Sequence, residues 1–424
     1  MTGARQARPA DTPSRRSRGG PGAPIAPLVS VVGLIVIVLG SLFVFSTFGL
    51  QASSDVVPTP APGDTGPVAT PVPLRTPNPT VIITPPPDLR PTIKGTLLFA
   101  RTGNIWAASG LDLKPIATAG TDSSPAWSPD GTTVYAIETK LKSDVQPPFK
   151  SGKFYLYVTN IVSMNADGSG RQEIYKGLFS QNGGQWYTGV YQPDVSPDGK
   201  TFALVSDYGY VPVSGCESCY QPVVLGTMTT SGTKLTNLNV RDANDLGHND
   251  PAWSPNGKQI AFTYNKHDGS DGAPRIGILT VASGKLTLLK PGYANPSWSP
   301  DGSSIAAERA TPTGRDVVVL DPGTGAELAR LTNDNDSFAP VWSPDGDQIA
   351  FLHRQGLGVD LEIMSLKIDT GGITLVDIKP VTQDGSLDAT SPPAWFIPVD
   401  QRTPPPQPPA APTGLPTDVP DSSP

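Results

Sequence analysis

Short runs of alternating apolar and polar residues recur through the middle of the chain. One of them is QIAFT at Gln259–Thr263, and a further apolar run follows at Gly277–Thr280. Alternation with a period of two residues predicts strands that bury one face. Gly and Pro separate the runs, so residues 94–400 are expected to form one large all-β unit rather than a helical bundle.

A single motif introduces most of these strands. It begins PAWSPDG at Pro125, PDVSPDG at Pro193, PAWSPNG at Pro251, PSWSPDG at Pro296 and PVWSPDG at Pro340, and a worn copy, PAWFIPVD, begins at Pro393. The intervals between these prolines are 68, 58, 45, 44 and 53 residues. The shortest intervals match one four-stranded blade of a β-propeller.

Each part of the motif has a physical reason. In Ser-Pro-Asp-Gly, proline presets φ, aspartate suits the third position and glycine accepts positive φ, so the chain turns tightly there. A large flat side chain at one fixed place per repeat suits packing between neighbouring twisted sheets. Five tryptophans are therefore expected to be structural: Trp127, Trp253, Trp298, Trp342 and Trp395.

Over residues 95–400 the chain resembles the TolB-like propeller repeat family, a WD-like group with the signature P-x-W-S-P-D-G followed by a strand such as I-A-F. The second copy departs from the signature at Val195, the third departs at Asn256, and the sixth lacks the turn. The resemblance implies a β-propeller. It also implies that relatives include binding proteins of the envelope, propellers that gate a serine peptidase domain, and lyases with histidine-bound metals.

The sixth copy predicts how the ring closes. Residues 393–396 supply only an innermost strand, whereas the strands predicted at 96–100, 104–108 and 114–118 lack an innermost partner. Pairing these segments gives a six-bladed β-propeller of four-stranded blades, closed by strands from both chain ends. Closure of this kind removes exposed sheet edges.

The segments on either side of the propeller have other compositions. Residues 28–50 form a charge-free apolar run long enough for one transmembrane helix, and five arginines precede it in the basic segment 1–27. This asymmetry predicts a cytoplasmic N-terminus and an extracytoplasmic propeller in a single-pass membrane protein. A cleaved signal peptide is the alternative, but the run exceeds the usual apolar length and no clean A-x-A site follows.

Proline is concentrated in two further segments. Residues 51–93 hold 12 of the 49 prolines and residues 401–424 hold 9. Few large apolar side chains accompany them, so both segments are expected to be extended and polyproline-like, the first as a linker and the second as a disordered tail. A proline-rich ligand for a groove is the alternative interpretation of each.

Charge narrows the choice of partner. The residues before Leu28 carry a net charge of +4 and the remainder carries −11, which together give the net −7 of the chain. An acidic propeller argues against nucleic acid as the main partner.

Catalytic motifs are sparse in this sequence. It has no G-x-S-x-G elbow, and its three histidines, His248, His267 and His353, lack metal-binding spacing and are expected to be ordinary surface or loop residues. The acidic stretches Asn333–Asp336 and Asp242–Asp250 lack the full spacing of a calcium loop, so turns are favoured over structural Ca²⁺. We therefore predict no enzyme activity, no catalytic residue, no metal and no cofactor.

The two cysteines, Cys216 and Cys219, lie in a segment with β-prone flanks. A redox-active pair needs a helix N-terminus to lower a thiol pKa, and this segment favours a hairpin instead. In an exported domain the expectation is a disulfide across the hairpin tip, with redox and metal roles as alternatives.

Aromatic residues supply the candidate ligand contacts. Residues 149–220 hold 13 of the 30 aromatic side chains, of which Tyr155 and Tyr157 alternate on a predicted strand and are expected in the core. Aromatic side chains on loops held by a rigid scaffold commonly bind peptides or sugars, although such loops also bury rings against one another. The candidates lie in a Gly/Gln-rich segment expected to be a loop and beside the cysteines: Trp186, Tyr187, Tyr191, Tyr208, Tyr210 and Tyr220.

These observations favour a membrane-anchored propeller that binds or scaffolds a protein, peptide or glycan at a cell envelope. A lyase or hydrolase acting on polysaccharide in the central funnel is the alternative from another class. A sensory ectodomain is a third interpretation, although the cytoplasmic segment 1–27 carries no signalling module, so a sensor would need a partner.

Overall fold

The computed structural model describes residues 90–145, 154–181, 183–207, 223–238, 240, 245–266 and 273–403. No helix in this part of the chain is long and apolar enough to cross a membrane. The predicted membrane segment 28–50, the basic segment 1–27, nearly all of the linker and the tail beyond Thr403 lie outside these ranges. The described helical element is the short 3₁₀ helix η1 (Val399–Gln401).

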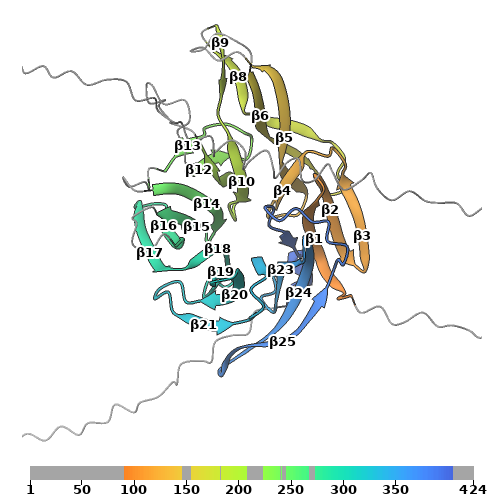
Figure 1. Cartoon of the computed structure of the whole chain (residues 1–424), viewed down its shortest axis with the longest axis vertical. Helices are drawn as coiled ribbons and strands as arrows, with labels where there is room; N and C mark the ends of the chain where they lie inside the picture. The colour runs from red at the N-terminus through yellow and green to blue at the C-terminus, as the bar shows by residue number, and fades with distance from the viewer. Residues whose placement is uncertain are drawn as a thin grey trace, which may run out of the picture. The chain divides into compact units, whose positions relative to one another are not determined.

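Within these ranges six four-stranded antiparallel sheets form the blades of a propeller (Figure 1). Blade 1 contains β26 (Ala394–Phe396), β1 (Ile93–Arg101), β2 (Asn104–Gly110) and β3 (Asp112–Ala117). Blade 2 contains β4 (Asp122–Trp127), β5 (Thr133–Val145), β6 (Phe154–Asn165) and β7 (Gln172–Lys176). Blade 3 contains β10 (Val190–Val195), β11 (Thr201–Ser206), β12 (Val224–Thr229) and β13 (Thr236–Asn237).

The other three blades follow in chain order. Blade 4 contains β14 (Asp245–Trp253), β15 (Gln259–Lys266), β16 (Arg275–Thr280) and β17 (Lys285–Pro291). Blade 5 contains β18 (Tyr293–Trp298), β19 (Ile305–Ala310), β20 (Arg315–Leu320) and β21 (Glu327–Arg330). Blade 6 contains β22 (Ser337–Trp342), β23 (Gln348–Gln355), β24 (Gly358–Asp369) and β25 (Gly372–Pro380). The expectation of six four-stranded blades is confirmed.

The ring closes as the sequence predicts. β26 pairs antiparallel with β1, with Trp395 opposite Leu97, so blade 1 combines one strand from the C-terminal end with three from the N-terminal end. Trp395 Nε1 also donates to the Lys94 carbonyl at 2.9 Å. In Figure 1 the orange β1 lies beside the blue strands of the C-terminal end.

The Ser-Pro-Asp-Gly segments form the expected turns between the first and second strand of a blade. In the first copy Gly131 has φ of +70° and its N–H donates to the Ser128 carbonyl at 2.9 Å. Ser128 Oγ donates to Asp130 Oδ1 at 2.6 Å, which fixes the turn from inside. Because strands alternate in direction, all these turns lie on one face of the propeller, here called the turn face; the opposite one is the open face.

The apolar core lies between the blades rather than at the centre. Six buried clusters each join two neighbouring blades, for example Leu98 and Ile105 of blade 1 with Val134 and Met164 of blade 2. Trp298, Trp342 and Trp395 are buried in such contacts, whereas Trp127 and Trp253 are half-buried. The repeat tryptophans therefore lie at blade interfaces and leave the axis to other side chains.

Blade 2 departs from the regular pattern by carrying an arm. β5 and β6 are 13 and 12 residues long, and the separate hairpin of β8 (Leu178–Gln181) and β9 (Gly184–Tyr187) follows this blade. Figure 1 shows this arm projecting from the ring. The expectation that Tyr155 and Tyr157 are core residues is wrong, since they are 79% and 58% exposed on the part of β6 that extends past the body of the blade.

Candidate functional site

The innermost strand of five blades carries a bulge directly before the repeat proline. Non-glycine residues at this place have positive φ between 47° and 52°: Ser124, Gln192, Asp250, Asn295 and Ala339. The strand register shifts at each one, for example between Asn249 and Ala252. A bulge re-aims side chains, and here the bulged residues line the cavities along the axis.

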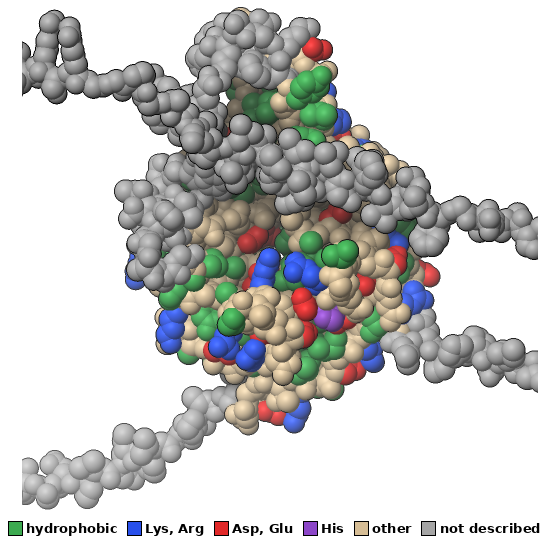
Figure 2. Space-filling model, in the orientation of Figure 1, with side chains coloured by type: hydrophobic (Ala, Val, Ile, Leu, Met, Phe, Trp, Pro, Cys, Tyr) green, Lys and Arg blue, Asp and Glu red, His purple; other side chains and the backbone are tan. Residues whose placement is uncertain are grey.

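A cavity of about 490 Å³ opens at the centre of the open face. Its wall comes from the bulges of blades 3 to 6, from the second strands of blades 4 and 5, and from the segment 389–392. The polar residues in that wall are Gln192, Asn249, Asp250, Thr263, Asn265, Asn295, Glu308, Thr390 and Arg315. Figure 2 shows acidic and basic side chains close together near the centre of the face in view.

Hydrogen bonds hold these polar residues in place, both between blades 3 and 4 and within blades 4 and 5. Gln192 Nε2 donates to Asp250 Oδ1 at 2.7 Å, and Thr263 Oγ1 donates to Asp250 Oδ2 at 2.9 Å. Asn295 Nδ2 donates to Glu308 Oε1 at 3.0 Å, and Arg315 Nη1 donates to Glu308 Oε2 at 2.9 Å. Both carboxylates are thus held in fixed positions, as a preorganised binding site requires.

The bulges also use these side chains as acceptors. The Asp250 N–H donates to Gln192 Oε1 at 2.9 Å, and the Ala339 N–H donates to Glu308 Oε1 at 3.0 Å. These two N–H groups do not bond within their own strand ladder, so a side chain of the preceding blade replaces the missing acceptor. The cavity wall therefore links neighbouring blades as well as presenting polar atoms.

Two acidic side chains share this wall in a low-dielectric setting. Burial and, to a smaller extent, the neighbouring Glu308 carboxylate raise the pKa of Asp250 to about 6. Hydrogen bonds from Thr263 and Gln192 partly offset that rise. An ionisable group with a raised pKa beside a cavity is a recognised indication of a functional site.

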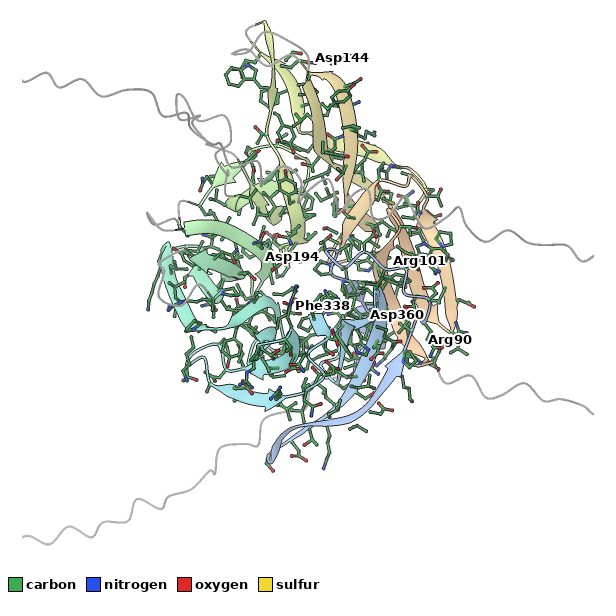
Figure 3. All side chains as sticks on the ribbon, in the orientation of Figure 1. Arg90, Arg101, Asp144, Asp194, Phe338 and Asp360 are labelled. Carbon is green, nitrogen blue, oxygen red and sulfur yellow. The ribbon has the colours of Figure 1, made fainter. Side chains whose placement is uncertain are left out.

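One side of the cavity rim combines aromatic and cationic groups. The guanidinium carbons of Arg315 and Arg354 lie 5.3 Å and 5.7 Å from the ring centre of Phe338. Figure 3 labels Phe338 on the inner side of the ring. Such stacking holds two cationic groups in place beside the cavity. The rim can thus contact a ligand's carboxylate or carbonyl groups, while the wall beneath offers acceptors.

The structure places one predicted aromatic residue at this site. Tyr191 lies on β10, not in a loop, and lines a groove of about 320 Å³ that shares Gln192, Asn249 and Thr390 with the central cavity. The Tyr187 hydroxyl lies behind it, 3.1 Å from the Tyr191 hydroxyl and 3.2 Å from Thr159 Oγ1.

The other predicted aromatics are not brought to the cavity. Trp186 lies on β9, where it pairs with Phe179 on the face of the hairpin opposite to Tyr187, and its Nε1 donates to the Gln181 carbonyl at 3.0 Å. The segment expected to be a Gly/Gln-rich loop is thus largely a hairpin. Tyr208, Tyr210, Tyr220 and the predicted Cys216–Cys219 disulfide lie outside the described residues.

The histidines do not converge on one place. His248 is fully buried on β14, where its Nδ1 accepts the Leu225 N–H at 2.8 Å, so the expectation of a surface or loop residue is wrong for it. His353 lies on β23 with Nδ1 2.9 Å from Glu362 Oε1, and His267 lies outside the described residues. Nowhere in the described ranges do three His, Cys, Asp or Glu side chains gather as a metal site.

A second cavity of about 250 Å³ continues along the axis and is lined by all six repeat prolines. Asp194 also lines it, and its Oδ2 accepts the Trp253 N–H at 2.6 Å (Figure 3). Burial raises the pKa of Asp194 to about 7, against the 3.8 of an unperturbed group. In the sequence Asp194 stands out because the other copies of the motif have a small or apolar residue directly after the repeat proline.

Asp194→Asn is expected to stabilise the propeller at pH 8. The folded state binds the Asp194 proton more tightly than the unfolded state, so the carboxyl group costs stability progressively as pH rises from about 4 to about 7. A pKa shift from 3.8 to about 7 corresponds to about 4 kcal/mol of stability. Solvent in the adjoining cavity screens the charge, so we expect Asp194→Asn to raise the free energy of unfolding by about 1–3 kcal/mol.

Urea unfolding of both proteins at pH 5 and pH 8 measures this effect. The stabilisation should be smaller at pH 5, and Asp112→Asn at an exposed position is the control. Equal gains at both pH values would contradict a raised pKa at Asp194.

Comparisons with known proteins bear on the fold. No model of a known protein family matches the sequence, and no curated protein matches it. Among solved structures, a protein assigned as TolB from Agrobacterium tumefaciens aligns with a TM-score of 0.51 and 15% identity, covering 73% of this chain and 95% of its own. TolB from Acinetobacter baumannii aligns with a TM-score of 0.48 and 20% identity, covering 71% and 66%. The first likeness establishes a shared propeller fold.

Proposed function

We propose that this chain is a binding module that takes a segment of a protein or peptide partner into the cavity on its open face. The observation that carries the proposal is the cavity of about 490 Å³ at the axis, with fixed polar groups contributed by several blades. Concave sites with a few fixed polar groups are the usual form of a ligand site in proteins.

The shape of the site favours an extended ligand over a compact one. The groove beside Tyr191 continues the central cavity through Gln192, Asn249 and Thr390, so contacts run from blade 2 to blade 6 across the open face. Amide, carboxylate and guanidinium groups alternate along this path and match the alternating donors and acceptors of a peptide backbone. Tyr191, which is half-buried, offers apolar surface at one place along it.

The cellular setting is part of the same proposal and rests on the sequence. The apolar run 28–50 and the arginines before it favour a single-pass anchor with the propeller outside the cytoplasm. The proline-rich linker would hold the propeller away from the bilayer and leave the open face accessible to partners at the cell envelope.

Filling the cavity tests the binding proposal. Peptides from a phage-displayed random library are selected on the purified full chain, and their affinity for Ala310→Trp is then measured. Ala310 is exposed and lines the cavity, so tryptophan should occupy the ligand volume and weaken binding by about tenfold or more without loss of core packing.

Ala282→Trp is the matched control, because Ala282 is an exposed alanine between β16 and β17 on the turn face. Its affinity for the selected peptides should stay within about twofold of the unsubstituted chain. Peptides that bind Ala310→Trp as well as they bind the unsubstituted chain would overturn the proposed site.

A further inference from the structure

The turn of blade 6 differs from the other Ser-Pro-x-Gly turns. In four copies the serine hydroxyl donates to the Asp or Asn two residues later, as Ser299 Oγ does to Asp301 at 2.6 Å. In blade 6 Ser343 Oγ instead lies 3.4 Å from Asp347 Oδ1. Asp345 therefore does not accept the hydrogen bond from the turn serine that its counterparts in the other four turns accept.

Asp345 binds the last described residue of the chain. Its Oδ1 accepts the Thr403 N–H at 2.9 Å, and its Oδ2 is paired with Lys94 Nζ. Lys94 Nζ also donates to Thr403 Oγ1 at 2.9 Å. The sequence that follows is PPPQPP at 404–409, so this turn fixes the point from which the proline-rich tail begins.

A cleft of about 320 Å³ adjoins this point, between blades 5 and 6 on the turn face. Asp345 and Gly346 form one side of it. Its apolar wall consists of Pro300, Trp342, Leu366, Ile368 and Ile373. The cleft is separate from the central cavity, because the two share no lining residue.

One polar group in this wall has no partner. Trp342 is 5% exposed, and its Nε1 has no hydrogen-bond partner in the described part of the chain. The same holds for Trp127 and Trp253, whereas Trp298 Nε1 donates to the Ala252 carbonyl at 3.2 Å. A buried donor without an acceptor costs roughly 1–3 kcal/mol. The nitrogen itself is closed to solvent. A ligand carbonyl would therefore reach it after a small displacement of cleft side chains.

Proline-rich segments suit such a cleft. A polyproline helix has no internal hydrogen bonds, so its carbonyls are available, and its rings pack into grooves lined by aromatic side chains. The segment 404–409 has no charge to bury and starts beside the cleft. At about 3.1 Å per residue its six residues extend roughly 19 Å, which is enough to cross the cleft.

We propose that residues 404–409 of this chain dock in the cleft between blades 5 and 6, with proline rings against Trp342 and Ile373 and a carbonyl accepting from Trp342 Nε1. Tethering makes even a weak contact effective, because a short linker gives an effective concentration of about 1 mM. A site with a dissociation constant of about 0.1 mM would then be roughly 90% occupied. The docked segment would cover this cleft on the turn face and leave the open face free.

Photocrosslinking in the full-length chain tests the docking. Gln407, the non-proline residue of the segment, is replaced by p-benzoylphenylalanine, and crosslinked peptides are identified by mass spectrometry. We expect intramolecular crosslinks to peptides that contain 342–347 or 366–373. The same probe at Asp418, farther along the tail, should give few crosslinks to these peptides.

Two variants on one strand separate docking from folding. Ile373→Glu places a charge in the cleft and should weaken docking about a hundredfold, which lowers occupancy to roughly 10% and the crosslink yield accordingly. Ile378→Glu, at a half-exposed position of the same strand that does not line the cleft, should leave the yield unchanged. Melting temperatures of both variants equal to that of the unsubstituted chain would show that neither substitution has unfolded the blade.

The indole N–H signal of Trp342 gives an independent readout. Trp342→Phe assigns the signal in a ¹⁵N spectrum of the seven tryptophans. Changing Pro404, Pro405, Pro406, Pro408 and Pro409 to serine should shift the signal, whereas changing Pro412, Pro416, Pro420 and Pro424 should not. An unshifted signal, crosslinks to other surfaces, or crosslinks only between two copies of the chain would each overturn the proposal.

Discussion

Removing residues 391–424 is expected to abolish cooperative unfolding of the propeller. The deletion takes away β26, and with it the pairing of Thr96, Leu97 and Leu98 in blade 1. Trp395 and Ile397 leave the buried cluster between blades 1 and 6, and the Ser391 hydroxyl no longer accepts the Ser124 N–H. An open ring exposes a hydrophobic edge strand, which favours aggregation over a single folded state.

Urea unfolding followed by circular dichroism and by tryptophan fluorescence measures this outcome. The truncated chain should show broad, non-coincident transitions or precipitate, because the two-state criterion fails. A chain ending at Thr403 retains β26, η1 and the Asp345 contact, and it should unfold in one transition at nearly the same midpoint as the full chain. A sharp single transition in the chain lacking 391–424 would contradict closure by the terminal strand.

The features that could be predicted from the sequence are those set by local chemistry repeated along the chain. Ser-Pro-Asp-Gly fixes a turn by itself, and Gly131 has the positive φ expected of it. The worn copy at Pro393 predicts ring closure because a strand without a following turn needs a partner elsewhere. The same reasoning failed for Tyr155 and Tyr157, because alternation shows that a strand has two faces but not that another sheet covers one of them.

The central cavity was harder to predict, since its chemistry depends on contacts between blades. Asp250 and Glu308 are 58 positions apart in the sequence, and no local motif joins them to the same wall. A bulge brings Asp250 there, and Glu308 faces the same wall from β19. The only sequence trace of the bulge is the residue before each repeat proline, a position where positive φ is not expected. Comparing that column across the copies would have indicated the polar side of the ring at Gln192, Asp250 and Asn295.

Arg171→Met is expected to cost about 3–5 kcal/mol of the free energy of unfolding. Asp122 has no exposed surface, and Arg171 binds it through both guanidinium nitrogens, Nη2 to Oδ1 at 2.7 Å and Nη1 to Oδ2 at 2.8 Å. Arg171 Nη2 also donates to Glu138 Oε1 at 3.0 Å. Methionine keeps the side-chain volume but leaves the buried Asp122 carboxylate without its cation, while Glu138 keeps Lys140 Nζ at 2.7 Å. Removing one partner of a buried ion pair is strongly destabilising.

Arg309→Met is the matched control, because Arg309 and Glu327 form an exposed pair at 3.4 Å whose loss should cost less than about 1 kcal/mol.

The pH dependence of the stability loss in Arg171→Met identifies the cause of that loss. Burial raises the pKa of Asp122 even with Arg171 in place, and removal of the cation should raise it further. The penalty in Arg171→Met should therefore shrink as the pH falls and Asp122 becomes neutral, whereas a loss of packing alone would be independent of pH. Adding Asp122→Asn to Arg171→Met should recover part of the stability at pH 8, since it removes one buried charge. If neither low pH nor Asp122→Asn restores stability to Arg171→Met, then Arg171 stabilises blade 2 through its aliphatic contacts rather than through its charge.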